Sequence, residues 1–282
     1  MESLLETKSI FSPEQFEKIE QLKEQISKGE LVLSFSAIKA FAKSPSHFLR
    51  YKIGDRVETP AMKKGTLIHC AILEPEELEK RYTTMNRKDM PNPDSDFRNS
   101  ENKAWKKAME AKAQSEGKEI VDPSEWDNAV RHRDLAYSNQ VIAPYLNGLR
   151  RREWRTEWEF EGFKWRGVID GLGPAYELDL KTVSDASPDK MKYLLPGEKY
   201  HWQHFLYRQS PEVGGYFKAF NLLVDGEYGI SLLKIQDHQI QKAEAEIRET
   251  LERFKFCAEN DLWEMNYEFW ANNPNQGYFT ID

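Results

Sequence analysis

Two neighbouring stretches of the sequence, RGVIDGLG at residues 166–173 and YELDLKTV at residues 176–183, decide the predicted fold. Both read as β-strands, because apolar and polar residues alternate in them and a glycine-rich turn separates them. Antiparallel pairing across that turn brings Asp170 beside Asp179, with Lys181 two residues further along the second strand. Two carboxylates and a lysine then converge at one edge of a sheet.

The second strand has one polar face and one apolar face. Glu177, Asp179 and Lys181 share a face because side chains alternate with a period of two, and the leucines between them face a core. A hard divalent cation such as Mg²⁺ prefers a few carboxylate oxygens and keeps several waters. Metal-assisted hydrolysis of a phosphodiester also needs a cation near the attacking water and the scissile phosphate. Short triplets of this kind occur often by chance, so a solvated strand edge stays the alternative on these residues alone.

The strands continue on both sides of this pair. Residues 152–183 alternate and contain the turn Glu161-Gly162, which predicts three antiparallel strands. Two more strands are predicted over 215–224 and 228–236, joined by Asp225-Gly226, a pair typical of hairpins.

Helical periodicity predicts most of the other elements. The segments are 13–28, 33–52 with a break near Pro45, 58–82, 101–116, 123–147, part of 196–215, and 238–259. The polar segment 85–102 is predicted to form a long loop or a mobile insertion. The predicted fold class is therefore α/β, with a mixed central sheet flanked by helices and an all-helical N-terminal region.

Composition excludes several classes of protein. Of the 282 residues, 39% are hydrophobic and 31% are charged, which suits a globular chain. Two cysteines are too few for a disulfide framework, a four-cysteine zinc site or a cysteine-held iron–sulfur cluster. No apolar run approaches the roughly 20 residues that span a bilayer, and the start lacks the features of a signal peptide. A cytoplasmic protein is expected, and the net charge of −7 argues mildly against a nucleic-acid partner.

The chain resembles the PD-(D/E)xK nucleases of the RecB-like branch, and most of all the nuclease domain of exodeoxyribonuclease VIII (RecE) and its phage and prophage relatives. Five stretches carry the resemblance in the family's order and span residues 33–207: LSFSAIKAFAKSPSHFL, ETPAMKKGTLIHCAILEPEELEKRY, RGVIDGL, ELDLKTVSDASP and YHWQHFLY. The resemblance implies a PD-(D/E)xK-like fold and one nuclease domain over 1–282. Its expected parts are an N-terminal helix (1–30), a helical region with a mobile insertion near 85–102 (31–150), a catalytic sheet core (151–260) and a tail (261–282).

The resemblance also implies a metal site. His69, Asp170 and Asp179 match the family's metal ligands, and the backbone carbonyl of Leu180 is implied as a further ligand. Lys181 matches the lysine that orients the attacking water and offsets charge on the phosphate. Without the strand motif, a core histidine would be the preferred interpretation of His69.

Two further residues match the family's Gln-x-x-x-Tyr motif. Gln203 and Tyr207 are four apart on a predicted helix, where they are expected to support the metal site or contact the DNA backbone. A buried aromatic residue is the alternative for Tyr207. Glu157 is a weak candidate for a second metal. The second acid is Asp, where many family members have Glu, and too few cysteines are present for the cluster-bearing subtypes.

Five residues are predicted to bind DNA: Ser34, Ser36, Arg50, Lys52 and Arg166. The two serines precede a predicted helix, whose N-terminus can hold a phosphate, and Arg50 and Lys52 are close in sequence. The alternative for Ser36 is a simple N-cap.

The expected activity is Mg²⁺-dependent digestion of linear double-stranded DNA, with Mn²⁺ able to substitute. The resemblance implies attack from the 5′ end, leaving a 3′ single strand for an annealing protein in phage-type recombination in a bacterial host. The alternatives are a single-strand or endonucleolytic RecB-like nuclease and a non-catalytic protein that binds DNA ends. Basic residues cluster at 150–155 and around His69, and acidic ones at 13–30, 74–79 and 244–252. This separation predicts a ring of three or four subunits with a basic lumen; the alternative is a monomer.

Overall fold

The computed structural model describes residues 12–54, 58–213 and 217–270. The parts of the predicted N-terminal and C-terminal segments at 1–11 and 271–282 lie outside the described residues. None of the described helices is both long enough and apolar enough to cross a membrane.

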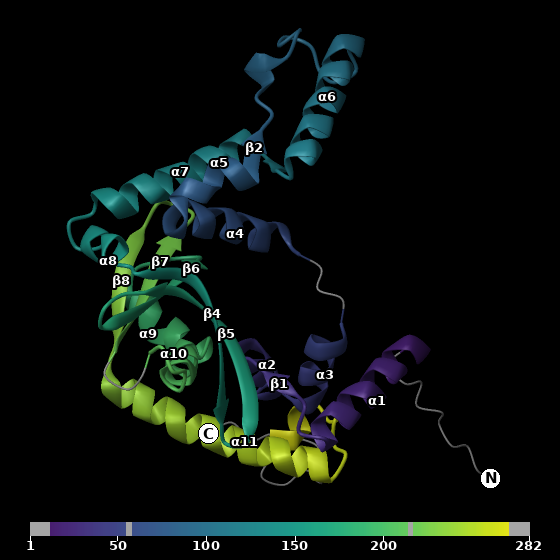
Figure 1. The fold of residues 1–282 in the computed structure, drawn as a ribbon, viewed down its shortest axis with the longest axis vertical. Helices are drawn as coiled ribbons and strands as arrows, with labels where there is room; N and C mark the ends of the chain where they lie inside the picture. The colour runs from purple at the N-terminus through teal and green to yellow at the C-terminus, as the bar shows by residue number, and fades with distance from the viewer. Residues whose placement is uncertain (1–11, 55–57, 214–216, 271–282) are drawn as a thin grey trace.

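A six-stranded mixed sheet forms the centre of the fold (Figure 1). Its strands are β1 (Val32–Leu33), β4 (Arg151–Phe160), β5 (Phe163–Leu172), β6 (Tyr176–Val183), β7 (Lys218–Asp225) and β8 (Ile230–Ile235). The order is β1-β5-β6-β7-β8, and β4 pairs with the other edge of β5. The pairs β4–β5, β5–β6 and β7–β8 are antiparallel, whereas β1–β5 and β6–β7 are parallel.

Helices cover both faces of this sheet (Figure 1). They are α1 (Pro13–Ser27), α2 (Phe35–Phe41), α3 (Pro45–Ile53), α4 (Pro60–Leu73), α5 (Leu78–Arg81), α6 (Ser100–Glu116), α7 (Pro123–Ser138), α8 (Ala143–Asn147), α9 (Pro188–Gly197), α10 (Tyr200–Arg208) and α11 (Asp237–Glu259). One hydrophobic cluster joins α1, α2, α3, α10 and α11 to β4 and β5, and a second joins α4 and α7 to β6 and β7. The predicted α/β class, with a mixed sheet flanked by helices and a helical N-terminal region, is confirmed.

The break predicted near Pro45 has a local cause. Ser44 is the N-cap of α3, its hydroxyl accepts a hydrogen bond from the N–H of His47, and Pro45 occupies the first helical position. Ser34 caps α2 in the same way by accepting from the N–H of Ala37. Two short helices therefore replace one long one.

The hairpin between β4 and β5 fixes the register of the central strands. Glu161 and Gly162 both have positive φ, 53° and 77°, as a two-residue hairpin turn of the mirror-image type requires. Phe160 then pairs with Phe163, and the ladder runs back from there to Arg151 and Leu172, interrupted between the pairs Trp154↔Ile169 and Arg152↔Gly171. The three antiparallel strands predicted over 152–183 are confirmed.

The helix predicted over 58–82 is wrong in its second half. α4 ends at Leu73, and Pro75 begins the short 3-10 turn η1 (Pro75–Glu77), because proline cannot donate the backbone hydrogen bond that a continuing helix needs. α5 follows, and Tyr82 already belongs to a strand.

Three other features differ from the sequence-based expectations. The helix predicted over 123–147 is divided after Ser138, where Asn139 turns its side-chain oxygen to the following N–H groups. α9 begins at Pro188, earlier than expected. The strand β1 and a small parallel sheet of β2 (Tyr82–Thr84) and β3 (Glu119–Val121) were not predicted.

Residues 85–118 form an excursion between β2 and β3, here named the α6 arm, which projects away from the sheet at the top of Figure 1. It contains the 3-10 turn η2 (Arg87–Asp89), and a second such turn, η3 (Tyr267–Trp270), ends the described chain. The buried Asn102 donates to the carbonyls of three loop residues, Asn92, Ser95 and Asp96. The mobility predicted for part of this arm stays a prediction.

Candidate functional site

One edge of β5 has two strand neighbours with a gap between them. β1 pairs with β5 at Lys164 and Trp165, and β6 pairs with it only at Gly171 and Leu172. β4 covers the other edge over its whole length. Between the two pairings, this edge of β5 has no partner among the described strands, and β6 diverges from it.

Side chains bond to backbone groups in this gap. The carboxylate of Asp170 accepts the N–H of Leu180 through Oδ2 at 2.7 Å. The hydroxyl of Tyr207, on α10, donates to the carbonyl of Val168 at 2.6 Å. The fork between β5 and β6 is therefore held open by side-chain hydrogen bonds, and Asp170 is fixed at its apex.

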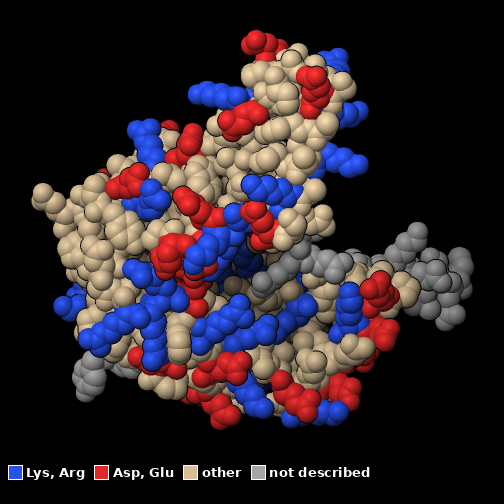
Figure 2. All heavy atoms as spheres, turned by 45° about the horizontal axis from the view of Figure 1, so that its top comes forward, with Lys and Arg blue, Asp and Glu red and all other residues tan. Residues whose placement is uncertain are grey.

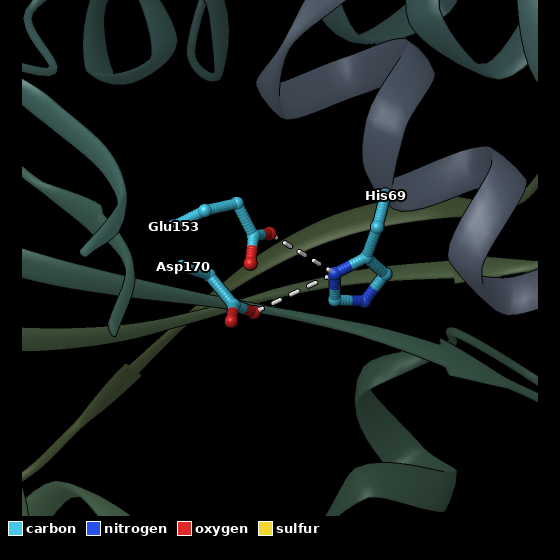
Figure 3. A group of neighbouring side chains, drawn as sticks. All are labelled: His69, Glu153 and Asp170. Carbon is cyan, nitrogen blue, oxygen red and sulfur yellow. Dashed lines mark ion pairs between the residues drawn. The ribbon is translucent and has the colours of Figure 1, made fainter. Parts of the chain in front are cut away.

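Three potential metal ligands meet at this fork (Figure 3). His69 comes from α4, Glu153 from β4 and Asp170 from β5. Nδ1 of His69 lies 3.9 Å from Oε1 of Glu153 and 3.9 Å from Oδ2 of Asp170. One ligand atom from each side chain lies within 4.8 Å of the others, so the three could bind one ion without large movement.

Glu153 reaches this group through the hairpin register. The pairs Arg152↔Gly171 and Trp154↔Ile169 place Glu153 opposite Asp170. Its φ of 47° is left-handed, which a residue with a side chain rarely adopts and which costs free energy. This local strain lies at the point where the side chain of Glu153 turns toward His69.

Asp179 lies on β6, one residue beyond Leu178, where the pairing with β5 ends. If that pairing continued, Asp179 would lie opposite Asp170. It is only 2% exposed, and both of its carboxylate oxygens accept hydrogen bonds. Oδ1 accepts from Nζ of Lys181 at 2.8 Å and from Nε2 of Gln203 at 2.7 Å. Oδ2 accepts from Nδ2 of Asn221 at 2.9 Å. Gln203 also donates to the hydroxyl of Tyr207 at 2.9 Å, so these two side chains of α10 together bridge Asp179 on β6 and Val168 on β5.

The electrostatics of the site favour a cation. Burial and the nearby Asp179 carboxylate raise the pKa of Asp170 to about 7. Burial alone would lower the pKa values of Lys181 and His69. The carboxylates of Asp179 and Asp170 raise the pKa of Lys181, and those of Glu153 and Asp170 raise the pKa of His69. A divalent cation would relieve this crowding of carboxylates and favour their ionised forms.

Two clefts open beside the fork, and Figure 2 shows a hollow on this side of the molecule with Lys and Arg side chains around it. The α4 cleft, about 920 Å³, is lined by Ala61, Met62, Gly65, Thr66, His69, Cys70, Glu74, Arg81, Tyr82, Glu153, Arg155, Val168 and Thr182. The α10 cleft, about 630 Å³, is lined by Ser34, Phe35, Ser36, Tyr51, Arg155, Thr156, Glu157, Arg166, Gly167, Val168, Gln203 and Tyr207. Arg155 and Val168 belong to both and face each other across the β4–β5 hairpin, so the clefts adjoin beside the metal-ligand group.

The structure separates the residues predicted to bind DNA into two sets. Ser34, Ser36 and Arg166 line the α10 cleft, whereas Arg50 and Lys52 are not among the described residues that line either cleft. Nζ of Lys52 donates to the carbonyl of Val32 at 2.8 Å. Ser34, not Ser36, is the N-cap of α2.

The predicted metal ligands also divide into sets. His69 and Asp170 belong to the three-residue group, and Asp179 lies beside it without belonging to it. Leu180 contacts Asp170 through its N–H. Glu157, considered for a second metal, pairs with Arg166 two positions further from the fork than Arg155.

Sequence reasoning missed Glu153 and Asn221. Glu153 could have been found by counting back from the turn Glu161-Gly162, because a two-residue hairpin fixes which residue faces Asp170. Asn221 carries no such local signal, because its place beside Asp179 comes from the parallel pairing of β6 and β7.

A family model described as "PDDEXK-like domain of unknown function (DUF3799)" matches residues 34–268. A search of curated proteins gives no match. Among solved structures, the chain is similar to a protein from Eubacterium rectale described as a candidate exonuclease, with 15% sequence identity, a TM-score of 0.56, and coverage of 97% of this chain and 96% of that chain. At this identity the likeness concerns the fold alone. The structure of SSO0001 gives 15% identity and a TM-score of 0.25, with coverage of 66% of this chain and 85% of that chain, which is too low to carry an argument.

Proposed function

The chain belongs to the family of PDDEXK-like domains, and from this premise we propose that it is a Mg²⁺-dependent exonuclease of linear double-stranded DNA. Family and fold together support a nuclease. The observation that carries the proposal is the meeting of His69, Glu153 and Asp170 next to the Asp179–Lys181 pair, where the two clefts adjoin. In this proposal, digestion starts at the 5′ end and leaves 3′ single strands.

The donor set fits a hard divalent cation with some borderline character. His69, Glu153 and Asp170 offer one imidazole nitrogen and two carboxylates within 4.8 Å, a set that suits Mg²⁺ and Mn²⁺. By resemblance, Asp179 and the carbonyl of Leu180 complete the ligands. When bound, the ion supplies charge neutralisation at the phosphate and lowers the pKa of a water molecule.

The chain's own residues supply the rest of the chemistry. The raised pKa keeps Lys181 cationic, and its side chain is 23% exposed beside Asp179, so its ammonium can face a phosphate and the attacking water. Gln203 holds the same carboxylate from α10 and fixes its orientation. Arg155 and Arg166 present guanidinium groups in the α10 cleft, where they can bind backbone phosphates on the scissile strand.

The overall charge of −7 does not oppose this activity, because local charge decides where a polyanion binds. In Figure 2, Lys and Arg form a band below the hollow and also lie at its rim, where Asp and Glu are present too, and further Asp and Glu lie along the lower edge of the same face. We propose that copies of the chain close into a ring of three or four subunits with the basic side inward. The product strand would then pass to an annealing protein in the cytoplasm of a bacterial host, with the chain encoded by the host, a phage or a prophage.

Labelled DNA tests the activity directly. Linear duplexes labelled at the 5′ or the 3′ end, a labelled single strand and a closed circular duplex are incubated with Mg²⁺, with Mn²⁺ or with a chelator. We expect early loss of the 5′ label from linear DNA with either metal and no cleavage of circles or under chelation. Cleavage of circular DNA would favour an endonuclease. Faster digestion of single strands than of duplexes would favour a single-strand nuclease. Binding to DNA ends without cleavage would favour a non-catalytic protein.

A lysine variant links the activity to the site. Lys181→Ala should lower the rate at least roughly 100-fold, because a positioned charge at the phosphate is lost. Binding to DNA in Ca²⁺, measured by fluorescence anisotropy, should change only a few-fold. Lys112→Ala, an exposed lysine on α6 that pairs with Glu116, is the matched control and should cut normally. Near-normal cleavage by Lys181→Ala would contradict the assignment.

Light scattering tests the ring. A multimer of three or four subunits is expected at micromolar concentration, and digestion already under way should continue after excess unlabelled DNA is added. A monomeric protein whose digestion stops when unlabelled DNA is added would contradict the ring but not the proposed nuclease activity.

A further inference from the structure

The buried strand β7 contains one polar residue in an apolar run. Ala219, Phe220, Leu222 and Leu223 are buried around Asn221, which is itself 0% exposed. Burying an amide costs free energy unless its groups are hydrogen-bonded. A polar residue at the centre of the sheet therefore needs a specific partner.

That partner is Asp179. The parallel register of β6 and β7 places Asn221 directly beside it, and Nδ2 of Asn221 donates to Oδ2 of Asp179 at 2.9 Å. Nζ of Lys181 and Nε2 of Gln203 both bond to the other oxygen, so Asn221 is the donor that holds Oδ2. A carboxylate has about four lone-pair positions, so three donors leave one for an ion and fix its direction.

A buried pair behind Asn221 supports this arrangement. His204 on α10 is 0% exposed and Glu177 on β6 is 1% exposed, and Nδ1 of His204 lies 3.2 Å from Oε1 of Glu177. Burial lowers the pKa of His204, whereas Glu177 and, to a smaller extent, Asn221 raise it, so Asn221 lies near this pair. The pair ties α10 to β6 two residues before Asp179 and one residue after Gln203.

We propose that Asn221 is a positioning residue for the metal site, which aims the free lone pair of Asp179 at the ion beside His69, Glu153 and Asp170. This role rests on the proposed function only in assuming that the site binds a divalent cation. An amide suits it because a neutral donor orients the carboxylate and leaves its charge available to the metal. Residues that orient a metal ligand typically change metal affinity or activity 10–100-fold when they are replaced.

The test measures metal binding without DNA. Mn²⁺ is titrated into the protein, and binding is followed by calorimetry and by the rise in unfolding temperature. Asn221→Leu keeps a similar volume but removes the donor, and the Mn²⁺ midpoint should rise roughly 10–100-fold. Asn221→Ser keeps a hydroxyl donor and should show a smaller rise. At saturating Mg²⁺, the KM for DNA should stay within about twofold of wild type, because the variant does not touch either cleft.

Asn102→Leu is the matched control. Asn102 is also 0% exposed, but its side chain donates to backbone carbonyls within the α6 arm, away from the metal site. Its replacement should lower the unfolding temperature and leave the Mn²⁺ midpoint unchanged. If folded Asn221 variants bind Mn²⁺ within twofold of wild type, the proposal is wrong. Loss of folding in both variants would also overturn it, because Asn221 would then serve the sheet alone.

The outcome separates this inference from the activity. A wild-type protein that binds Mn²⁺ but leaves DNA intact would contradict the exonuclease proposal, while the Mn²⁺ midpoints would still decide the role of Asn221. A wild-type protein that cuts DNA, with variants that bind Mn²⁺ normally, would contradict the role of Asn221 alone.

Discussion

Two buried regions of the molecule are built from opposite kinds of residue. The aromatic cluster beside α11 consists of Phe41, Phe48, Phe163, Phe254 and Trp263. The polar seam along the fork consists of Asp170, Glu177, Asp179, His204 and Asn221. Phe254 meets two other rings of the cluster edge to face, with its ring centroid 4.9 Å from that of Phe41 and 5.2 Å from that of Trp263. Phenylalanine rings have no polar group that needs a hydrogen-bond partner. The seam requires donors, counter-charges and, in the proposed function, an ion.

Burying the polar seam therefore lowers the free energy of unfolding. Burial raises the pKa of Glu177 as well as that of Asp170, which means that both carboxylates are less stable as anions than they would be in water. The cluster has no such cost. Variants of the two regions should therefore separate activity from stability.

The largest effect is expected at the apex of the fork. Asp170→Asn removes a carboxylate that the proposed function assigns to the metal while keeping the shape of the side chain, so activity should fall roughly 1,000-fold or more, about 4 kcal/mol of transition-state stabilisation. In a chelator, the unfolding temperature should stay the same or rise, because a buried charge has been removed. A variant that loses both activity and stability would show that the seam supports the fold as the cluster does.

The aromatic cluster should behave in the opposite way. Phe254→Ala should lower the free energy of unfolding by roughly 3–5 kcal/mol, because it leaves a cavity among four other rings. Cleavage per folded molecule should not change. Urea unfolding measures the first quantity, and the cleavage rate at low temperature, corrected for the folded fraction, measures the second.

Asp225 is a carboxylate outside the seam, and its replacement can be compared with that of Asp170. Asp225 at the β7–β8 turn accepts backbone N–H bonds from Ala186, Glu227 and Gly229, and the hydrogen bond from Ala186 leads the contacts that lower its pKa. Asp225→Ala should cost about 1–3 kcal/mol at pH 7.

The pH dependence of this cost has a definite sign. Because the pKa of Asp225 is lowered in the folded protein, its contribution is present above the unfolded value of about 3.9 and is lost as the pH falls through the folded value. The difference between wild type and Asp225→Ala should therefore shrink toward pH 3 in urea unfolding. A difference that grew toward pH 3 would contradict the assignment.

The smallest effect is expected at the rim of the fork. Tyr207→Phe removes the hydroxyl that donates to the Val168 carbonyl and accepts from Gln203, and it should lower stability by about 1 kcal/mol. Cleavage should fall only a few-fold, because Gln203 keeps its bond to Asp179. Thermal unfolding and initial rates measure the two effects, and an unchanged unfolding temperature would mean that water replaces the hydroxyl.

The locally determined part of the fold could be predicted from the sequence. Alternation and the turn Glu161-Gly162 predicted the strands that hold Asp170 and Asp179, and the turn also determines the position of Glu153. Glu157 was considered for a second metal and Glu153 was not, because acidic residues at alternate positions of a strand look alike without a count from the turn.

The non-local part could not be predicted from pattern. The pairing of Asn221 with Asp179 joins residues from strands separated by α9 and α10, and no local periodicity specifies that partner. The two-residue strand β1 has too few residues to show alternation. The α10 cleft depends on the placement of β1 and of β6, because it lies beside the gap that these two strands leave along β5.

The register of β6 has a consequence for the fidelity of folding. The pairing that buries Leu178 and Leu180 in the core also sets Asp179 between Asp170 and Asn221. A slip of one residue would turn every side chain of the strand to the other face, so it would move the leucines out of the core and onto the polar side of the strand, and dismantle the site in one step. Misregistered chains would therefore be unstable as well as inactive, and a partly folded molecule would pose little risk of stray damage to DNA in the cell that makes it.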